Sequence, residues 1–217
     1  MTTLLPVEVV FEDQALLVLN KPSGLLSVPG KGADKQDCLS ARVQQLCPDA
    51  LTVHRLDQAT SGLVVMARGA AMQRALSQAF AARGVEKRYV AVVDGHVASA
   101  SSQQWQLIDL PLAADWPHRP KQCVDTARGR PSRSSYRVMH YNPVTDSSRL
   151  ELAPLTGRTH QLRVHLQAIG HAILGDALYA TAAAQAKADR LLLHASGISL
   201  RHPATGEPMT WSREPLF

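Results

Sequence analysis

Short apolar runs separated by turn residues dominate the pattern along the chain. Residues 7–11 and 15–20 are rich in valine and leucine and flank three polar residues, which predicts a hairpin. Residues 63–67 form an apolar run of buried-strand length. Because polar residues and a glycine precede that run, we expect a second hairpin over residues 53–68, with Asp57 at the end of its first strand.

Two segments show the periodicity of amphipathic helices. In residues 70–83 an apolar stripe predicts a helix that packs on a core and ends before Gly84; the stripe consists of Met72, Leu76, Ala79 and Phe80. Asp37 would cap a second, shorter helix that stops at Pro48; its buried face would contain Leu39, Val43, Leu46 and Cys47.

A third helix is expected between Thr159, which would cap it, and Gly170, which would end it. Its core-facing residues would be Leu162, Leu166 and Ile169, with His160, Arg163 and Gln167 on the opposite side. Arg158 stands at the entrance of this helix, where the helix dipole disfavours a cation unless an anion is close. We therefore expect a carboxylate or a phosphate near Arg158.

The remaining strand signals lie at residues 85–94, 134–141, 149–154 and 191–200, and a last hairpin turns at residues 202–207. In the first of these strands Tyr89 shares one face with an alanine and a valine, so its simplest role is packing in a core. The chain is thus predicted to be rich in strands, with few helices and no internal repeat.

A length of 217 residues, 45% of them hydrophobic and 19% charged, is typical of an ordinary globular chain with a real core. The formal net charge of +5 is compatible with a polyanionic partner. Aromatic residues make up only 5%, which argues against a module that stacks bases on paired aromatics.

Between residues 115 and 137, six lysines and arginines are accompanied by two acids, and prolines and a glycine disfavour regular structure through much of the stretch. Such a loop suits a phosphate backbone, but a solvated surface arm is an equally good interpretation of the same charges. If the loop binds RNA, the candidate contacts are Arg119, Lys121 and Arg128.

The three cysteines lie far apart, so neither a disulfide framework nor a CxxC metal site is expected. The first residues lack the basic start of a signal peptide, and no apolar run reaches membrane-spanning length. We therefore expect a cytoplasmic protein without a membrane segment.

Sequence motifs for metal, nucleotide and serine-hydrolase chemistry are missing. His160 and His165 are five residues apart, not the four of a zinc-binding helix, and no glutamate lies between them. Neither GxSxG nor a phosphate-binding glycine loop occurs. What remains is an acid near a strand end, a tyrosine on a strand and an arginine at a helix start. This set suits chemistry on a polyanion with no cofactor and no metal.

Taken alone, Asp57 and Thr60 would merely hydrogen-bond their own turn, as such residues commonly do. However, HRLDQATSGLVVMAR resembles the HRLD motif of the RluA family of pseudouridine synthases, enzymes that isomerise uridine in RNA. Further blocks resemble the same family in the same order: LVLNKPSGLLSVPG, EKRYVAVVDG, LPLAADWPHRPKQ, LTGRTHQLRVHLQAIGHAILGD and LLLHA. Together they span nearly the whole chain.

The resemblance implies an α+β fold with a mixed, largely antiparallel sheet in two halves flanking a catalytic cleft. It implies one catalytic domain over residues 1–217, without the N-terminal S4 domain of many relatives. The DWPHRPKQ block and the short length are most similar to the dual-specificity branch, which acts on 23S ribosomal RNA and on the tRNA anticodon stem-loop. These RNAs are the expected partners of a monomeric enzyme.

The resemblance also assigns roles to single residues. Asp57 would be the catalytic aspartate, acting on the ribose while the N-glycosidic bond breaks, either by attack on C1′ or by removing a proton from C2′. Arg158 would pair with it and favour its ionised form. Tyr89 would stack on the uracil as it turns over. Arg55 would fill the space left by the flipped base, and the neighbouring His54 would also contact the RNA.

Three other functions remain open at this point. The first is a synthase restricted to one class of RNA. The second is a catalytically silent RNA-binding factor, whose function Asp57→Asn would leave intact. The third is a phosphodiesterase or nuclease that uses histidines, which chelator sensitivity and strand cleavage would reveal.

Overall fold

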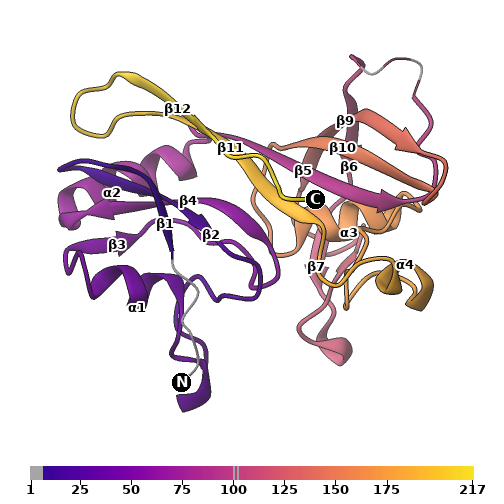
Figure 1. Cartoon of the computed structure of the whole chain (residues 1–217), viewed down its shortest axis with the longest axis horizontal. Helices are drawn as coiled ribbons and strands as arrows, with labels where there is room; N and C mark the ends of the chain where they lie inside the picture. Colours follow the sequence, from indigo (N-terminus) through magenta and orange to yellow (C-terminus); the bar gives the residue numbers. More distant parts are fainter. Residues whose placement is uncertain (1–6, 100, 102) are drawn as a thin grey trace. The chain divides into compact units, whose positions relative to one another are not determined.

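The computed structural model describes residues 7–99, 101 and 103–217. The chain divides into two compact units, whose elements are labelled in Figure 1. Unit 1 contains the described residues up to Lys87 together with His194–Leu216, and unit 2 contains Arg88–Leu193 and Phe217. Strands predominate in both units and helices are few, which confirms the α+β prediction.

Unit 1 is built around strand β4 (Ser61–Arg68). β2 (Leu16–Lys21) pairs antiparallel with one edge of β4, and β1 (Glu8–Glu12) pairs with β2 as the predicted hairpin. On the other edge, β11 (Leu193–Arg201) runs parallel to the start of β4 and β3 (Ala50–Thr52) runs antiparallel to its end. β4 therefore has partners on both edges, which explains why all its residues but the last are buried.

The expected hairpin over residues 53–68 exists, but its first strand is β3, which ends at Thr52. Residues 53–56 were expected to be strand; they lie instead in the connection to β4. Asp57 is thus a loop residue and not the last residue of a strand. Only three residues, Ala50, Leu51 and Thr52, find partners on β4, because β11 occupies the start of the same edge.

Helix α2 (Gly69–Ala81) confirms the helix predicted from its apolar stripe. All four residues of the stripe belong to one apolar cluster with side chains of β2, β4 and β11: Met72, Leu76, Ala79 and Phe80. After the helix, Arg83 adopts the left-handed conformation with φ 60°, and Gly84 donates its N–H to the Ala79 carbonyl. The left-handed residue that closes the helix is therefore Arg83, one position before the glycine.

Strand β12 (Pro208–Ser212) pairs antiparallel with β11 and confirms the predicted last hairpin. Trp211 of β12 packs against Phe11 of β1, with ring centroids 5.3 Å apart. In the turn of this hairpin, His202 Nε2 lies 2.9 Å from a carboxylate oxygen of Asp13. The last strands of the chain thus contact the first hairpin within unit 1.

Helix α1 (Leu39–Gln44) forms where a helix was expected, after the short 3-10 helix η1 (Ala33–Lys35), but its cap is different. Cys38 is the N-cap, and its sulfur accepts the N–H of Ala41 at 3.4 Å. Asp37, the predicted cap, is ion-paired with Arg42 at 2.6 Å. Because the Asp37 carboxylate pairs with Arg42, the hydrogen-bond acceptor at the start of the helix is the sulfur of Cys38.

The buried face of α1 is also smaller than predicted. Leu39 and Val43 are buried, whereas Leu46 is 84% exposed. Leu46 follows the end of the helix and therefore does not continue its apolar stripe.

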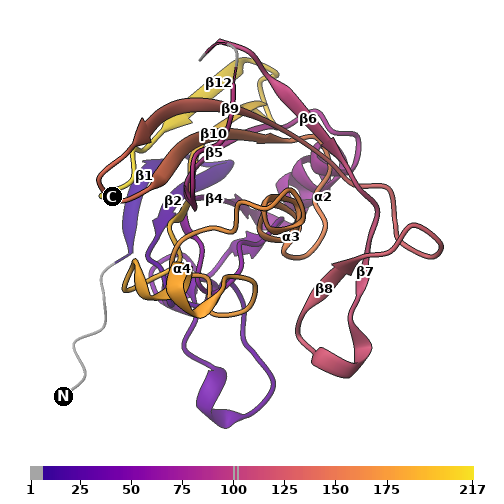
Figure 2. The ribbon, with the colours of Figure 1, turned by 90° about the vertical axis from the view of Figure 1, so that its right-hand side faces the viewer.

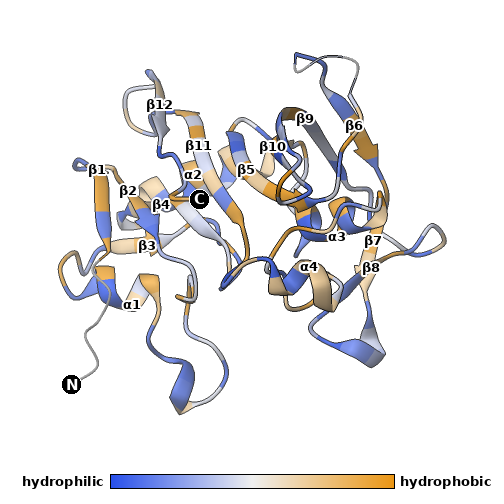
Figure 3. Cartoon of the chain, turned by 45° about the vertical axis from the view of Figure 1, so that its right-hand side comes forward, coloured by the Kyte–Doolittle hydropathy of each residue, from blue (hydrophilic) through white to orange (hydrophobic). Residues whose placement is uncertain are grey.

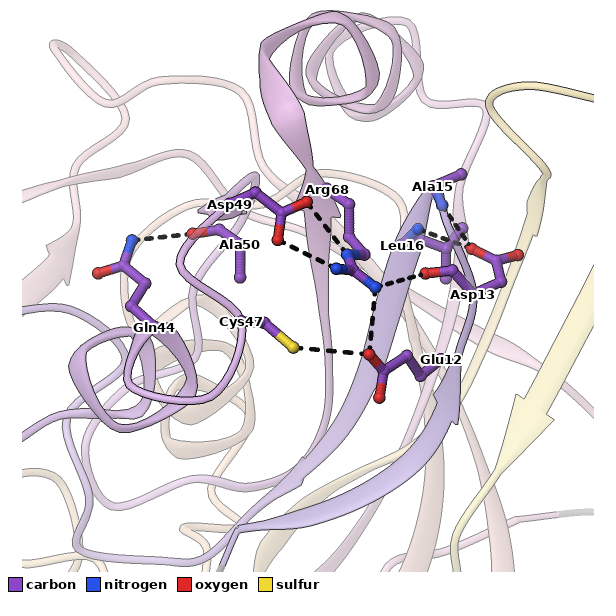
Figure 4. Close-up of polar contacts among 9 residues, drawn as sticks. All are labelled: Glu12, Asp13, Ala15, Leu16, Gln44, Cys47, Asp49, Ala50 and Arg68. Carbon is purple, nitrogen blue, oxygen red and sulfur yellow. Dashed lines mark hydrogen bonds and ion pairs between the residues drawn. The ribbon is translucent and has the colours of Figure 1, made fainter.

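Arg68, the last residue of β4, joins the β1–β2 turn to the segment before β3 (Figure 4). Its guanidinium donates to Asp49, to Glu12 and to the backbone carbonyl of Asp13, each at 3.2 Å. Cys47, which was expected in the core, is only half-buried here, with its sulfur 3.5 Å from Glu12. Polar contacts thus link the chain segments at this end of the sheet.

Unit 2 contains four antiparallel strands in the order β5 (Glu86–Asp94), β10 (Ser147–Pro154), β9 (Arg133–Asn142) and β6 (Gln106–Asp109). β5 and the β9–β10 hairpin confirm three of the predicted strands. Figure 2 shows these strands curving over helix α3 (Gln161–Ala168), which contacts β9 and β10. The short helix α4 (Ala182–Ala186) follows. Among the described residues, no helix is long and apolar enough to cross a membrane.

Helix α3 differs from its prediction at its start and on its polar side. The N-cap is His160, with a left-handed φ of 54°, and not Thr159. Arg163, expected on the outer side, is 4% exposed, and His165 is fully buried. Gly170 ends the helix with φ 88°, as predicted. A helix under a curved sheet is surrounded on most sides, so Arg163 and His165 are buried, whereas Gln167 is exposed as predicted.

Residues 112–124 form a separate two-stranded sheet, the β7–β8 hairpin, in place of the irregular loop predicted there. Its strands are β7 (Leu112–Ala114) and β8 (Gln122–Val124), and the 3-10 helix η2 (Trp116–His118) lies in their connection. Figure 2 shows the hairpin extending away from the main strands of unit 2, and Figure 3 shows that its far end is hydrophilic. Two of the six predicted basic loop residues, Arg133 and Arg137, belong to β9.

Candidate active site

The loop that carries Asp57 is hydrogen-bonded to the loop that follows β2. The hydroxyl of Ser27 donates to the Leu56 carbonyl at 2.7 Å and accepts the Leu56 N–H at 3.0 Å. The hydroxyl of Ser23 donates to the Ala59 carbonyl at 2.7 Å. These bonds lie on both sides of Asp57, so its backbone is fixed before any substrate arrives.

Lys21, the last residue of β2, is fully buried between these loops. Its ammonium donates to the carbonyls of Pro22, Leu25 and Gln58 at 2.9, 2.7 and 3.1 Å. Burial lowers the pKa of Lys21 to about 7, and the negative charge of Asp57 opposes this shift. The three carbonyls also favour the ammonium form, so Lys21 places a positive charge near the Asp57 carboxylate.

Lys21 is not among the residues predicted from the sequence. The available signal is a lysine that closes an otherwise apolar strand, LLVLNK, directly before a proline. A buried ammonium at such a position needs acceptors, and here they come from backbone carbonyls. Because one of these belongs to Gln58, 37 residues further along the chain, only the folded structure shows the connection to Asp57.

His54 has a structural role within unit 1. Its Nε2 accepts the backbone N–H of Val65 at 2.9 Å, and its ring stacks on Phe80 with centroids 4.4 Å apart. Burial lowers the pKa of His54 to about 3, with a smaller contribution from the charge of Lys87, so the imidazole is neutral. These contacts anchor the segment before Asp57 to β4 and α2. The predicted contact of His54 with RNA stays a prediction.

Arg55 and Asp57 differ in exposure. Arg55 is exposed, whereas Asp57 is half-buried. The carbonyl of Asp57 accepts the N–H of Thr60 at 3.1 Å, so the turn is closed by backbone groups. The turn therefore does not depend on the Asp57 carboxylate for this bond.

Tyr89 lies on β5, half-buried, in unit 2. Its partner across the strand pair is Leu152, near the end of β10. The chain runs from that end of β10 to Arg158, so the structure places Tyr89 beside the strand that leads to Arg158. Asp57 belongs to unit 1, whereas Tyr89 and Arg158 belong to unit 2.

Arg158 is exposed and precedes α3, on a turn that is fixed by a buried glutamine. The side chain of Gln161 accepts the Arg158 N–H at 3.0 Å and the Thr156 hydroxyl at 2.7 Å. Its amide nitrogen donates to the Arg133 carbonyl and to the Ser134 hydroxyl, both at 2.9 Å. The backbone that presents Arg158 is thus tied to β9.

The predicted basic contacts lie in and after the β7–β8 hairpin. Arg119 and Lys121 belong to the connection between its strands. Arg128 lies beyond β8, with its side chain 88% exposed and 3.2 Å from Asp125. Hydrogen bonds from the backbone and side chain of Arg128 lower the pKa of Asp125, so this acid stays ionised and offsets one of the positive charges.

Tyr179 joins the hairpin to the start of α3. Its hydroxyl accepts the N–H of Gln122 at 2.8 Å and lies 2.6 Å from Nδ1 of His160. Asp176 accepts the N–H of Tyr179 at 3.2 Å and is bound by Arg163 through two hydrogen bonds of 2.7 Å. A buried ion pair thus orients the tyrosine that holds the hairpin. This network could not be predicted from the sequence, because its members are scattered between residues 122 and 179.

The histidines that suggested a metal or a nuclease have protein partners. His165 lies 3.0 Å from both the Ser134 hydroxyl and the Leu110 carbonyl, and His194 lies 2.8 Å from the Ser61 hydroxyl. In the part of the chain that the structure describes, no three His, Cys, Asp or Glu side chains gather in a group that suits a metal ion. These imidazoles therefore have a structural role.

Comparison with known proteins identifies the family. The model of the RNA pseudouridylate synthase family matches residues 15–168. Escherichia coli (strain K12) has a dual-specificity RNA pseudouridine synthase, RluA, that is 47% identical over 203 residues, which is 94% of this chain and 90% of that protein. The protein of the same name from Yersinia pestis is 47% identical over 209 residues, 96% of this chain and 99% of its own.

A solved structure agrees with this result. The human RNA pseudouridylate synthase domain containing 1 protein superimposes with a TM-score of 0.79 at 26% identity, covering 97% of this chain and 84% of that one. The chain belongs to the RNA pseudouridylate synthase family, and it is an enzyme that isomerises uridine in RNA. The resemblance found in the HRLD segment and the later blocks is confirmed.

Proposed function

We propose that the protein converts specific uridines to pseudouridine in two kinds of RNA, 23S ribosomal RNA and the tRNA anticodon stem-loop. The observation that carries this proposal is the 47% identity, over 94% of the chain, to a relative named as a dual-specificity RNA pseudouridine synthase. The DWPHRPKQ block in the β7–β8 hairpin, resembling the same branch of the family, supports it. The enzyme acts as a cytoplasmic monomer.

Asp57 is the proposed catalytic residue. Its loop is fixed by Ser23 and Ser27, and the buried side chain of Lys21 interacts with the charge of its carboxylate. The carboxylate acts on the ribose of the target uridine while the N-glycosidic bond breaks, by attack on C1′ or by removal of the C2′ proton. Both routes require the ionised form.

The other site residues act on the base and the RNA. The released uracil turns over and C5 bonds to C1′. In the first route the bond from Asp57 to C1′ breaks in this step, and in the second route Asp57 returns the proton to C2′. The C5 proton passes to solvent as N1 is protonated, so the atoms balance without a second substrate. Tyr89 stacks on the turning uracil, Arg158 pairs with Asp57, and Arg55 fills the space that the flipped base leaves. Around them, three basic side chains contact the RNA backbone: Arg119, Lys121 and Arg128.

A tritium-release assay tests this proposal. The purified protein is incubated, without added cofactor, with 5-tritiated uridine in an anticodon stem-loop and in a 23S RNA fragment. We expect release from both RNAs by the wild type, and a loss of at least about a thousandfold in Asp57→Ala, because the carboxylate takes part in bond breaking. Asp34→Ala, which removes an exposed carboxylate of the same unit, is the matched control and should release tritium at the wild-type rate.

The same assay separates the other functions. Release from only one RNA would establish a single-substrate synthase. Equal release by wild type and Asp57→Ala would contradict the catalytic role of Asp57. Binding without release from any RNA would indicate a silent RNA-binding factor. Chelator-sensitive strand cleavage, visible on a denaturing gel of the same reactions, would indicate a nuclease.

A further inference from the structure

The β7–β8 hairpin presents an exposed indole at its far end. Trp116 begins η2 and is 70% exposed, although indoles are usually largely buried. The guanidinium carbon of Arg119 lies 3.3 Å from the centroid of its ring, which is face-to-face stacking distance. Because Arg119 covers one face, most of the exposed area belongs to the other face and the ring edges.

The other two tryptophans are used differently. Trp211 packs against Phe11 at the apolar cluster of unit 1. Trp105 is 37% exposed and lies 5.1 Å from two arginines, Arg88 and Arg137, that are ion-paired with one glutamate of β10. Both indoles thus take part in internal packing, whereas Trp116 extends into solvent from a hairpin.

The backbone beneath Trp116 is closed by hydrogen bonds. Asp115 and Lys121 are joined at 3.0 Å, His118 donates to Asp115 at 3.1 Å, and Lys121 donates to His118 at 3.0 Å. The base of the hairpin is held by the bond from Gln122 to the Tyr179 hydroxyl. A ring held in this way loses little conformational entropy when a planar ligand stacks on it.

The positive charge around the Trp116 ring favours a ligand that carries negative charge. Four basic residues lie in or just after the hairpin: Arg119, Lys121, Arg128 and Arg130. A planar aromatic surface among positive charges fits a nucleobase whose phosphates pass the basic side chains, and only a base outside a double helix offers a free face for stacking. Fully paired RNA contributes phosphates and 2′-hydroxyls but no such face.

We propose that Trp116, backed by Arg119, is a stacking platform for an unpaired nucleobase of the RNA substrate that lies outside the catalytic position. The proposal rests on the proposed function, because it assumes that RNA is the molecule bound. One aromatic ring on a hairpin is sufficient here, unlike the paired aromatics that the low aromatic content of the chain argues against.

Tryptophan fluorescence tests the platform directly. In a Trp105→Phe/Trp211→Phe background, Trp116 is the only one of the 3 tryptophans left. Adding Asp57→Ala keeps the RNA unmodified during titration, and circular dichroism with urea unfolding checks that this protein is folded. We expect the anticodon stem-loop to quench the fluorescence, and a fully paired RNA duplex of equal length to bind without quenching.

Affinity and its salt dependence distinguish stacking from charge. Trp116→Ala should weaken stem-loop binding by about tenfold without changing the slope of log Kd against log salt, and Trp116→Phe should retain affinity within about threefold. Arg119→Gln should reduce the slope by about one, and Arg119→Lys should keep the slope but weaken the quenching. His118→Gln, next to the platform, is the control and should bind like the parent.

Each contrary result overturns the platform. Wild-type affinity in Trp116→Ala, equal quenching by stem-loop and duplex, or a changed salt slope in Trp116→Ala would show that the indole is not a stacking surface. If the wild type releases tritium while Trp116→Ala binds normally, the proposed function stands and the platform alone is wrong. If no RNA binds to the parent protein, both are wrong.

Discussion

The ammonium of Lys21 interacts with the charge of Asp57 although Lys21 is fully buried and Asp57 is half-buried. The lysine is buried in unit 1, where it binds three backbone carbonyls, and it also interacts with the charge of the proposed catalytic carboxylate. One buried cation thus serves both stability and the electrostatics of the site, and this makes its removal informative.

We expect Lys21→Met to lower the free energy of unfolding by about 3 kcal/mol, because three backbone carbonyls lose the donor that they share. Urea unfolding at pH 7, followed by circular dichroism, measures this change. Lys31→Met removes an exposed lysine of the same unit and should change stability by less than about 0.5 kcal/mol. Equal stability of the two variants would mean that the carbonyls of Pro22, Leu25 and Gln58 do not depend on Lys21.

The neutral His54 makes stability depend on pH. Its pKa is lowered from 6.5 to about 3 by burial, so below pH 6.5 the unfolded chain binds a proton that the folded chain does not. As the pH falls from 6.5 toward 3, the titration of His54 should lower the free energy of unfolding by up to about 1.4 kcal/mol per pH unit. Above pH 6.5 the titration of His54 should not affect stability. His54→Gln removes the titration.

Urea unfolding of wild type and His54→Gln at pH 7, 6 and 5 measures this contribution. The stability advantage of the wild type should shrink as the pH is lowered. A constant difference between the two proteins over this range would show that His54 is not held in its neutral form.

Gly62 allows β4 to approach β11. It has φ +113°, and a Cβ there would lie 2.3 Å from the carbonyl oxygen of Ala195. Gly62→Ala should cost about 3 kcal/mol or more, since both backbone strain and a backbone clash are introduced. Gly206 has φ +77° with nothing within 4 Å of such a Cβ, so Gly206→Ala reports the strain alone, about 1 kcal/mol. Thermal unfolding of both variants gives the comparison, and similar losses would argue against the clash.

The ion pair of Arg163 and Asp176 is buried, with side chains 5% and 0% exposed. Arg163→Met should destabilise the protein by about 3–5 kcal/mol, because it leaves a buried carboxylate without its cation. The double variant with Asp176→Asn should lose much less than the sum of the single variants. The exposed pair Arg133–Asp109 is a matched control, whose coupling should be below about 1 kcal/mol. Equal coupling in both cycles would contradict a special role of burial.

Elements whose evidence is local were predicted well from the sequence. The stripe of α2, the β1–β2 hairpin and the β9–β10 hairpin depend on periodicities and turns within a few residues of one another. The HRLD block and its companions indicated the family because they occur in the family's order along the chain. For the helix and the two hairpins, the partners are neighbours in the sequence.

Features that depend on distant partners were not predictable in this way. Arg163 has the spacing of a solvent-facing residue, and only the fold brings Asp176 to it, 13 residues away. Lys21 was not singled out from the sequence, and the hydrogen bond that His54 accepts from Val65 was not foreseen. Only the fold places the carbonyl of Gln58 beside Lys21 and the N–H of Val65 beside His54. For Leu46 the sequence predicted burial and the residue is exposed, because the apolar spacing continues past the last turn of α1.

The order of the strands in unit 1 has a consequence for biosynthesis. β4 carries its antiparallel partner β2 close by in the chain, but its parallel partner β11 follows only after nearly all of unit 2. During translation, the edge of β4 at Ser61 and Gly62 therefore stays unpaired until β11 has been made. The strands of unit 2 emerge in the meantime and can pair among themselves. Closing so long a loop is slow, and an uncovered strand edge is prone to wrong pairing. The strand order of the unit that holds Asp57 is thus complete only after β11 and β12 have been made.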